Sequence, residues 1–391
     1  MRLTLNPSAP LGSAMPEASA APFDAFRYAH DRFHQIVWMS QNTNHLFPSG
    51  PIEEALVQAI KDRRYPDYPL GSGDPELKEL VRKDFPIPGA EVGITSGGTE
   101  ALYMLTRALL EPGDEVLASD PSYLIIHRFI ELAGARAIAQ GIYRPPYRLD
   151  LEEVKEAIGP KTRMILLIDP LNPLGSGYPP EEVRAFAEVA HDHKLLLLHD
   201  TTYRDFADRH TLAAPFYPEG TITIWSVSKN CGLAGLRVGG LLASPALFSR
   251  IWKYNTNDLG VNVLAQVAAK AALRAKPQVI EAIRRQTREN QRMIREVVEQ
   301  VPGVSLPVYP SQANMFALDI SQTGVDPEAL QKELLVHHGV FLRAGNYLSL
   351  QYGKRFIRAS FSNLPSDIEA FGKAFAPALA ACRPVAAASP A

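Results

Sequence analysis

Residues 90–245 alternate short apolar runs with longer amphipathic stretches, and this alternation constrains the fold more than any other feature. The runs expected to form buried strands are 92–95, 115–118, 163–169, 194–199, 221–226 and 238–243. The stretches expected to form helices between them are 99–110, 122–133 and 181–193. The pattern predicts an α/β fold with a mostly parallel sheet covered on both faces. In such sheets, ligand-binding groups gather at the carboxyl ends of the strands.

The rest of the chain predicts a smaller α+β domain. Residues 277–300 have a long polar helix pattern that can link two lobes. Beyond it, short strands are expected at 315–320, 340–343 and 356–361, with helices at 326–338 and 366–381. We expect residues 23–60 and 290–382 to form the small domain and residues 61–289 to form the large, ligand-binding domain. The Ala/Pro-rich ends, 1–22 and 383–391, are expected to be a flexible arm and a flexible tail.

Charge and cysteine content narrow the functional class. The 391 residues include 40 basic and 42 acidic side chains, with a formal charge of −2 and no block of like charge. This balance argues against nucleic acid or an anionic membrane as the main partner. No apolar run reaches the roughly 18 residues of a membrane span, and the first 22 residues lack the apolar core of a signal peptide. Cys231 and Cys382 offer neither a disulfide framework nor metal-ligand spacing. We therefore expect a cytoplasmic protein without a bound metal.

Lys229 lies in a segment, residues 225–239, that contains two serines and an arginine. A nucleophilic lysine must lose its proton near neutral pH, which burial or cationic neighbours favour. Such an amine forms a Schiff base with an aldehyde, and Ser226, Ser228 and Arg237 are groups that a phosphate on that aldehyde would need. Taken alone, the motif is also compatible with a surface lysine beside a Gly-rich turn.

Two further turns follow expected strands. Gly97, Gly98 and Thr99 stand where a strand meets a helix, so that backbone N–H groups can approach an anion. A simple tight turn is an equally good interpretation of these residues in isolation. Tyr123, after the next strand, can cover a planar ring, although a tyrosine at the start of a helix is usually a packing residue.

Four polar side chains complete the candidate site. Asp200, at a buried strand end, requires a positive partner, such as a protonated pyridine nitrogen. Tyr203 is three residues further on and can reach an oxygen on the same ring, and the loop prolines around Asn172 present its amide as a donor. Arg358 alternates with apolar residues on a strand and suits bidentate capture of a carboxylate. The alternatives are an Asn-Pro turn at Asn172 and an exposed edge arginine at Arg358.

These residues, in this order, resemble the pyridoxal-phosphate-dependent aminotransferases of fold type I, class I/II. The motif most specific to this family is Ser-x-Ser-Lys-x-x-Gly-x-x-Gly-x-Arg-x-Gly, which begins at Ser226. Three further motifs fit the family independently: the Asp200/Tyr203 pair, Pro-x-Asn-Pro-x-Gly around Asn172, and Tyr68-x-x-x-x-Gly-x-Pro-Glu-Leu. The resemblance covers roughly residues 40–380. The segment 42–45 (Asn-Thr-Asn-His) is similar to the histidinol-phosphate aminotransferase branch, in which proline more often stands at the position of His45.

The resemblance implies a role for each residue. Lys229 would hold the cofactor as a Schiff base and then shuttle a proton, with Asp200 and Tyr203 as the other catalytic residues. Asp200 would keep the pyridine nitrogen protonated. The implied cofactor-binding set is Gly97, Gly98, Thr99, Tyr123, Asn172, Asp200, Tyr203, Ser226, Ser228, Lys229, Arg237 and, from the neighbouring subunit, Tyr68. Arg358 and Asn44 would bind substrate.

The reaction implied is amino-group transfer between an amino acid and a 2-oxo acid by a ping-pong mechanism, in a homodimer. A decarboxylase, a C–S lyase or an amino-acid oxidase on the same scaffold is the alternative, because the pocket decides which Cα bond breaks. Leu174 and Thr201 depart from the usual threonine and glutamate, but neither position supplies a cofactor contact. The amino donor is not predicted, since no second arginine can be assigned to a distal carboxylate.

Overall fold

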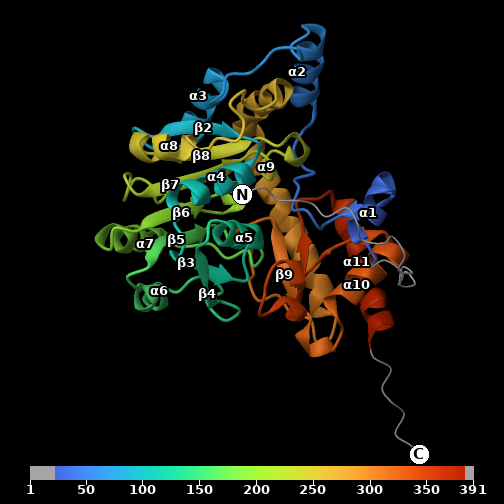
Figure 1. Ribbon diagram of the computed structural model, residues 1–391. Coiled ribbons are helices and arrows are strands. Elements are labelled where there is room, and N and C mark those ends of the chain that lie inside the picture. Colours follow the sequence, from blue (N-terminus) through green and yellow to red (C-terminus); the bar gives the residue numbers. More distant parts are fainter. Residues whose placement is uncertain (1–22, 384–391) are drawn as a thin grey trace, which may run out of the picture.

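The structure is a computed structural model that describes residues 23–383 (Figure 1). The arm expected at 1–22 and residues 384–391 of the expected tail lie outside the described residues.

A seven-stranded sheet forms the centre of the larger lobe, in the order β2-β8-β7-β6-β5-β3-β4. The strands are β2 (Glu91–Thr95), β3 (Glu115–Asp120), β4 (Arg136–Gly141), β5 (Thr162–Ile168), β6 (Leu196–Asp200), β7 (Thr221–Ser226) and β8 (Gly239–Ala243). Strand β8 runs antiparallel to both of its neighbours, and the pairs among β3, β4, β5, β6 and β7 are all parallel. The predicted α/β fold with a mostly parallel sheet is confirmed.

Strand β4 was absent from the sequence prediction. Its residues are half-buried or exposed, because it pairs on one side only, with β3. An edge strand of this kind lacks the continuous apolar run by which the other strands were found.

Helices surround the sheet, and their starts follow local capping rules. They are α3 (Pro75–Asp84), α4 (Gly98–Leu109), α5 (Leu124–Leu132), α6 (Leu151–Ala157), α7 (Pro180–Asp192) and α8 (Pro245–Trp252). Asp74, Asp150 and Ser244 cap α3, α6 and α8 by accepting from backbone N–H groups. Consecutive residues of one strand, such as Ile224 and Trp225 in β7, belong to different apolar clusters. Both faces of the sheet are therefore covered.

The long helix α9 (Val263–Glu299) joins the two lobes (Figure 1). The predicted start at Pro277 was wrong, since that proline lies inside the helix. The preceding segment is rich in alanine, a strong helix former, and buries Ala265, Ala268 and Ala272. Proline removes only one backbone donor, which tertiary packing of a 37-residue helix can offset.

The smaller lobe contains an antiparallel sheet in the order β11-β12-β9. Its strands are β9 (Met315–Asp319), β11 (Arg343–Ala344) and β12 (Phe356–Ser360), and its helices are α1 (Ala25–His30), α10 (Pro327–His338) and α11 (Pro365–Cys382). Near the amino terminus, β1 (Val37–Trp38) pairs in parallel with β10 (Val340–Phe341), which fixes the following residues 39–44 beside the large lobe. Helix α2 (Gly50–Lys61) packs on α9, and its Ile52 joins the apolar cluster that contains Trp225.

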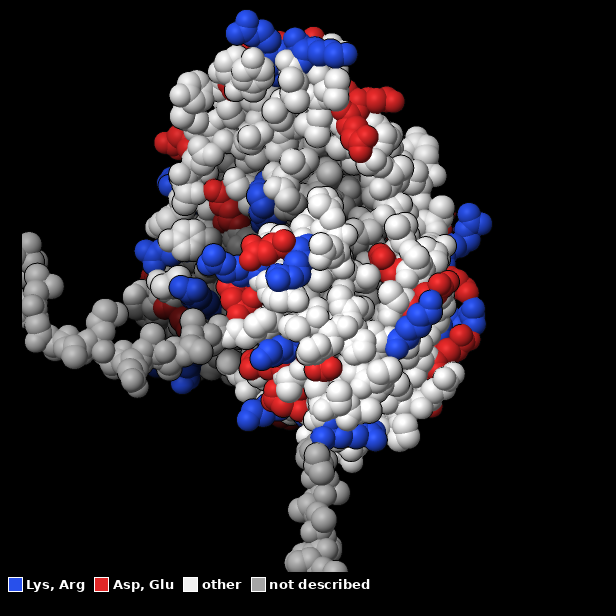
Figure 2. All heavy atoms as spheres, turned by 90° about the vertical axis from the view of Figure 1, so that its right-hand side faces the viewer, with Lys and Arg blue, Asp and Glu red and all other residues white. Residues whose placement is uncertain are grey.

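The face in Figure 2 carries basic and acidic side chains interspersed, without a large patch of one sign. Within residues 23–383, no helix is long and apolar enough to cross a membrane.

Candidate active site

A cavity of about 490 Å³ lies where the carboxyl ends of the large sheet meet the small lobe. Most of the predicted site residues line it: Gly98, Thr99, Tyr123, Asn172, Asp200, Tyr203, Ser226, Ser228, Lys229, Arg237 and Arg358. Residues that sequence reasoning did not assign also line it, among them Ser40, Gln41, Asn42 and Arg343. Strand ends far apart in the chain thus converge on one space, as expected for a parallel sheet.

Lys229 follows β7 and is only partly buried, with its side chain facing the cavity. Its Nζ donates a hydrogen bond of 2.6 Å to the carbonyl oxygen of Gln41. Burial, and then the positive charges of Arg358 and Arg237, lower the pKa of this amine to about 7. A substantial fraction of Lys229 is therefore neutral at neutral pH, which a nucleophilic or basic amine requires.

The turn before α4 and the Arg237 guanidinium together have the shape of an anion cradle. Gly97 has a φ of +82°, and a Cβ there would lie 2.5 Å from Nη2 of Arg237. Glycine at this position therefore lets the guanidinium lie directly on the turn. At the other end of the cradle, the N–H of Ser228 donates to Oγ of Ser226 at 3.1 Å. A phosphate dianion would need several donors. The start of α4, the hydroxyls of Thr99, Ser226 and Ser228, and the Arg237 guanidinium can provide them.

Asp200 ends β6, and its side chain lines the cavity although the residue is only 7 % exposed. Burial raises the pKa of its carboxyl, and hydrogen bonds from the Thr202 hydroxyl and N–H to Oδ1, of 2.6 and 3.0 Å, partly oppose that shift. A cationic ring nitrogen in the cavity would stabilise the ionised form of this buried carboxylate. Tyr123 also lines the cavity, with its hydroxyl 3.3 Å from that of Thr99.

Arg358 and Asn172 form one unit on the small-lobe side. Nη1 of Arg358 donates to Oδ1 of Asn172 at 2.9 Å, Nη2 donates to the carbonyl of Ser40, and Nε is buried without a partner. Because Oδ1 of Asn172 accepts from the arginine, its amide nitrogen is left as a donor. Burial lowers the pKa of Arg358 to about 10, so the guanidinium stays cationic at neutral pH.

Tyr203 is buried, and its hydroxyl accepts from Nδ2 of Asn42 at 3.1 Å. Burial raises its pKa to about 12, which keeps the phenol protonated at neutral pH. The residues 40–42 thus contact Arg358, Lys229 and Tyr203 in turn. Sequence reasoning missed these residues, because two of the three act through backbone carbonyls, which leave no side-chain signature.

Three predicted residues do not line the cavity. Gly97 lies just behind it, under Arg237. The amide of Asn44 donates to the carbonyl of Asn230 at 2.7 Å. Tyr68 is 80 % exposed and lies outside the cavity lining.

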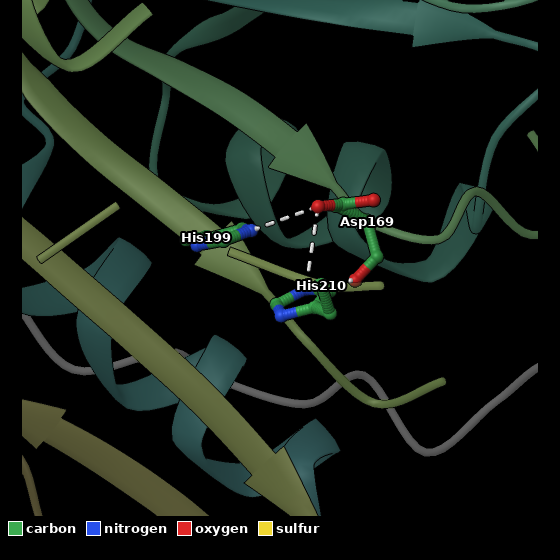
Figure 3. A group of neighbouring side chains, drawn as sticks. All are labelled: Asp169, His199 and His210. Atoms are coloured by element: carbon green, nitrogen blue, oxygen red, sulfur yellow. Dashed lines mark hydrogen bonds and ion pairs between the residues drawn. The ribbon is translucent and has the colours of Figure 1, made fainter. Parts of the chain in front are cut away.

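Behind the cavity, Asp169, His199 and His210 form a buried group (Figure 3). Oδ2 of Asp169 lies 3.6 Å from Nε2 of His199 and 3.2 Å from Nε2 of His210. The N–H of Ala213 donates to Nδ1 of His199, so its ring proton is on Nε2. Nε2 of His210 also faces the Asp169 carbonyl at 3.1 Å, so it too carries a proton.

Although these three side chains are close enough to share a metal ion, both ring protons point to the place where an ion would bind. We therefore assign close polar contacts between the carboxylate and the two rings, rather than metal coordination, to this group. The N–H of Asp169 donates to the carbonyl of Asp200 at 2.9 Å, which joins the ends of β5 and β6. The group supports the end of β5, which Asn172 follows, and the end of β6, where Asp200 stands.

Comparisons with known proteins agree with this geometry. A family model described as aminotransferase class I and II matches residues 34–370, and the chain belongs to that family. It is a pyridoxal-phosphate-dependent aminotransferase, and the donor set around the cavity fits that cofactor.

Individual relatives carry different names. The arginine–pyruvate transaminase of Pseudomonas aeruginosa is 31% identical over 265 residues, which are 66% of this chain and 67% of that protein. A histidinol-phosphate aminotransferase of Carboxydothermus hydrogenoformans is 29% identical over 321 residues, 80% of this chain and 83% of that protein. An aminotransferase structure from Mycobacterium tuberculosis shares the fold, with a TM-score of 0.80 at 21% identity over 91% of this chain and 95% of that one. The predicted likeness to the histidinol-phosphate branch is confirmed at the level of distant relatives.

Proposed function

We propose that this aminotransferase acts on an amino acid and a 2-oxo acid, with Lys229, Asp200 and Tyr203 as its catalytic groups. The observation that carries the proposal is the position of Lys229 between the Arg237 cradle and Arg358, with a pKa lowered to about 7. Pyridoxal phosphate, when bound, supplies an aldehyde that exchanges amines and a ring that withdraws electrons from the bond being broken. The neutral Nζ of Lys229 can then accept a proton from the substrate Cα and return it.

Each remaining side chain has a proposed task. Gly97, Gly98, Thr99, Ser226, Ser228 and Arg237 would hold the phosphate. Asp200 would pair with the ring nitrogen, Asn172 and Tyr203 would bond the ring oxygen, and Tyr123 would cover the ring face. The supporting observation is that one cavity receives the donors, the buried carboxylate and the aromatic ring together.

Arg358 would hold the substrate α-carboxylate, because its Nε is buried without a partner and its fork faces the cavity. Retaining the carboxylate leaves the Cα–H bond as the one to break, which favours transamination over decarboxylation. Asn44, expected to bind substrate, would act by holding residues 41–44 over Lys229 through its bond to Asn230.

A half-reaction screen tests this function. The cofactor-loaded protein is mixed with a panel of amino acids, and the loss of the cofactor aldehyde absorbance is followed. We expect at least one amino acid to convert wild-type protein, and none to convert a Lys229→Ala variant. Release of carbon dioxide or a thiol without amine transfer would replace transamination by the alternative reactions.

We also propose a homodimer in which Tyr68 reaches the phosphate site of its partner. Tyr68 is 80 % exposed and lies among other exposed apolar side chains, Tyr65 and Leu70. A mixing experiment tests this arrangement. Lys229→Ala and Tyr68→Phe proteins each lack one part, but a mixed dimer contains one complete site, so co-refolding is expected to restore activity. Failure to restore activity while mixed dimers form would exclude a shared site.

The two-domain division, 23–60 with 290–382 and 61–289, remains our proposal for the chain, with α2 packed on the large-domain side. We propose a cytoplasmic location as well. Cys231 and Cys382 are both free thiols in the structure, as expected in a reducing compartment.

A further inference from the structure

Asp120 is a buried carboxylate that has no task in the function proposed above. It ends β3, is only 1 % exposed and does not line the cavity. Its Oδ1 accepts the backbone N–H of Leu350 at 3.1 Å, and its Oδ2 accepts that of Gln351 at 2.9 Å. Burying a carboxylate is costly unless a cation or hydrogen bonds compensate it. Within residues 23–383 no lysine or arginine pairs with Asp120, so the two backbone donors compensate its burial.

Both donors belong to the smaller lobe. Leu350 and Gln351 lie in the β11–β12 connection, which comprises residues 345–355. Beside them, the N–H of Ser122 donates to the carbonyl oxygen of Leu348 at 2.9 Å. Residues 120–122 of the larger lobe therefore hold residues 348–351 of the smaller lobe by three hydrogen bonds.

Apolar packing secures only one end of the held segment. Leu348 is 4 % exposed and belongs to the apolar cluster of the larger lobe that contains Ile224. Leu350, by contrast, is 77 % exposed, and Gln351 is exposed as well. The position of residues 350–351 therefore depends on the Asp120 carboxylate rather than on burial.

The two ends of the β11–β12 connection are pressed together. Gly345 lies so close to the Gly353 carbonyl that a Cβ would have no room, and a Cβ at Gly353 would lie 2.7 Å from Cα of Asn346. Because backbone meets backbone without free space, a displacement of residues 350–351 is passed on to residues 346–348.

Cavity-lining residues stand on both sides of this attachment. Tyr123 is three residues beyond Asp120, and Tyr347 and Leu348 shortly precede Leu350. Three residues span at most about 10 Å of chain, so the attachment acts close to the cavity wall. It therefore sets the spacing between Tyr123 on the larger lobe and the wall that Tyr347 and Leu348 form on the smaller lobe.

We propose that Asp120 is a positioning residue, which holds the β11–β12 connection at the spacing that an amino-acid substrate needs between Tyr123 and the wall formed by Tyr347 and Leu348. Asp120 touches neither substrate nor cofactor and acts through the backbone N–H groups that it holds. The inference rests on the proposed function only for the identity of the ligand as an amino acid.

Asp120→Asn tests the attachment with little change in side-chain shape. An amide oxygen accepts one of the two N–H groups, and the amide nitrogen then faces the other, so that a donor meets a donor. Losing a charge-assisted hydrogen bond corresponds to about 10- to 100-fold in an equilibrium. We expect hydrogen exchange of the amides of residues 348–352, followed by mass spectrometry on the cofactor-loaded protein, to be faster by about that factor.

Asp114→Asn is the matched control. Asp114 directly precedes the same strand at its other end, is 8 % exposed and also accepts a backbone N–H, that of Glu111 at 2.8 Å. Its other partner, Arg163, belongs to the larger lobe as well. We expect this control to leave hydrogen exchange at residues 348–352 as it is in wild type.

Ligand binding separates positioning from mere support of the fold. In Asp120→Asn we expect the KM of the best amino donor to rise about tenfold, with kcat and the Kd of pyridoxal phosphate unchanged, because the wall contributes to binding of the ground state and the transition state alike. The Kd of 3-phenylpropionate, an unreactive carboxylate with a ring, is measured by calorimetry and is expected to rise by the same factor. Unchanged exchange, or unchanged KM and Kd in spite of faster exchange, would overturn the proposal, and so would a loss confined to kcat or to cofactor binding.

A second variant and a turnover-free readout keep the test decisive. If Asp120→Asn does not fold, Asp120→Glu replaces it, since glutamate keeps two acceptor oxygens but displaces them by one methylene. If wild type transferred no amino group at all, the proposed function would fail, whereas hydrogen exchange and 3-phenylpropionate binding would still decide whether Asp120 positions the wall.

Discussion

Replacing Arg358 by glutamine removes the group proposed to hold the substrate carboxylate. In the structure Arg358 is buried, and its guanidinium already donates to Asn172 and to the Ser40 carbonyl, so the fork is held before a substrate arrives. A carboxylate would gain two charge-assisted hydrogen bonds, each contributing about 1.5–3 kcal/mol. Their loss corresponds to about 10²- to 10⁴-fold in kcat/KM, at 1.36 kcal/mol for each factor of ten.

The assay is steady-state kinetics on the best amino donor, with cofactor content checked by absorbance in each variant. Arg355→Gln is the matched control. Arg355 directly precedes β12, but it is partly exposed and pairs with Asp319 at 3.2 Å, away from the cavity lining. We expect the control to retain wild-type kinetics. A loss of less than about tenfold in Arg358→Gln would refute the assignment, since a single lost charge-assisted bond already exceeds that value.

Three further outcomes are expected. Because burial lowers the pKa of Lys229 to about 7, its amine is mostly neutral above that pH. The rate at which apo-protein captures pyridoxal phosphate should therefore rise between pH 6 and pH 8 and then level off. A rate that continued to rise toward pH 10 would show that burial does not lower this pKa. Gly97→Ala places a Cβ against Arg237 at a position with a positive φ. We expect weaker cofactor binding in a fluorescence titration, with secondary structure unchanged in circular dichroism. Wild-type affinity would show that the phosphate does not bind in the cradle. Burial alone would raise the pKa of Asp169, but the contacts of His199 and His210 outweigh it and lower the pKa to about 2. Its stabilisation is present above the unfolded pKa near 4 and is lost as pH falls toward 2, so Asp169→Asn should lower the free energy of unfolding at pH 7 by about 2 kcal/mol, and wild-type stability in urea unfolding would contradict this role.

Sequence patterns predicted the central strands because those strands are buried on both faces and appear as uninterrupted apolar runs. Strand β4 escaped the same reasoning, since it lies at the sheet edge and none of its residues is fully buried. The start of α9 was misplaced because Pro277 was interpreted as the beginning of a helix, whereas the packing of the alanine-rich turns before it carries the helix through the proline.

In the candidate site, too, some residues were predictable from the sequence and others were not. Asp200 and Lys229 were predictable, since each stands at or shortly after the end of a strand and belongs to a spaced motif. The contributions of Ser40 and Gln41 were not, because they are made by backbone carbonyls. Arg343 has no motif at all. Its position depends on a two-residue strand and on Phe26 and Tyr347, which only the folded chain brings together.

We propose that Lys229 is the residue that binds the cofactor aldehyde. Borohydride reduction of the cofactor-loaded protein, followed by peptide mass spectrometry, identifies that residue, because reduction makes the bond between cofactor and lysine permanent. We expect a single pyridoxyl modification, located on Lys229 and absent from a Lys229→Ala variant. A modification on another lysine, or none in a protein that still carries the cofactor, would contradict it.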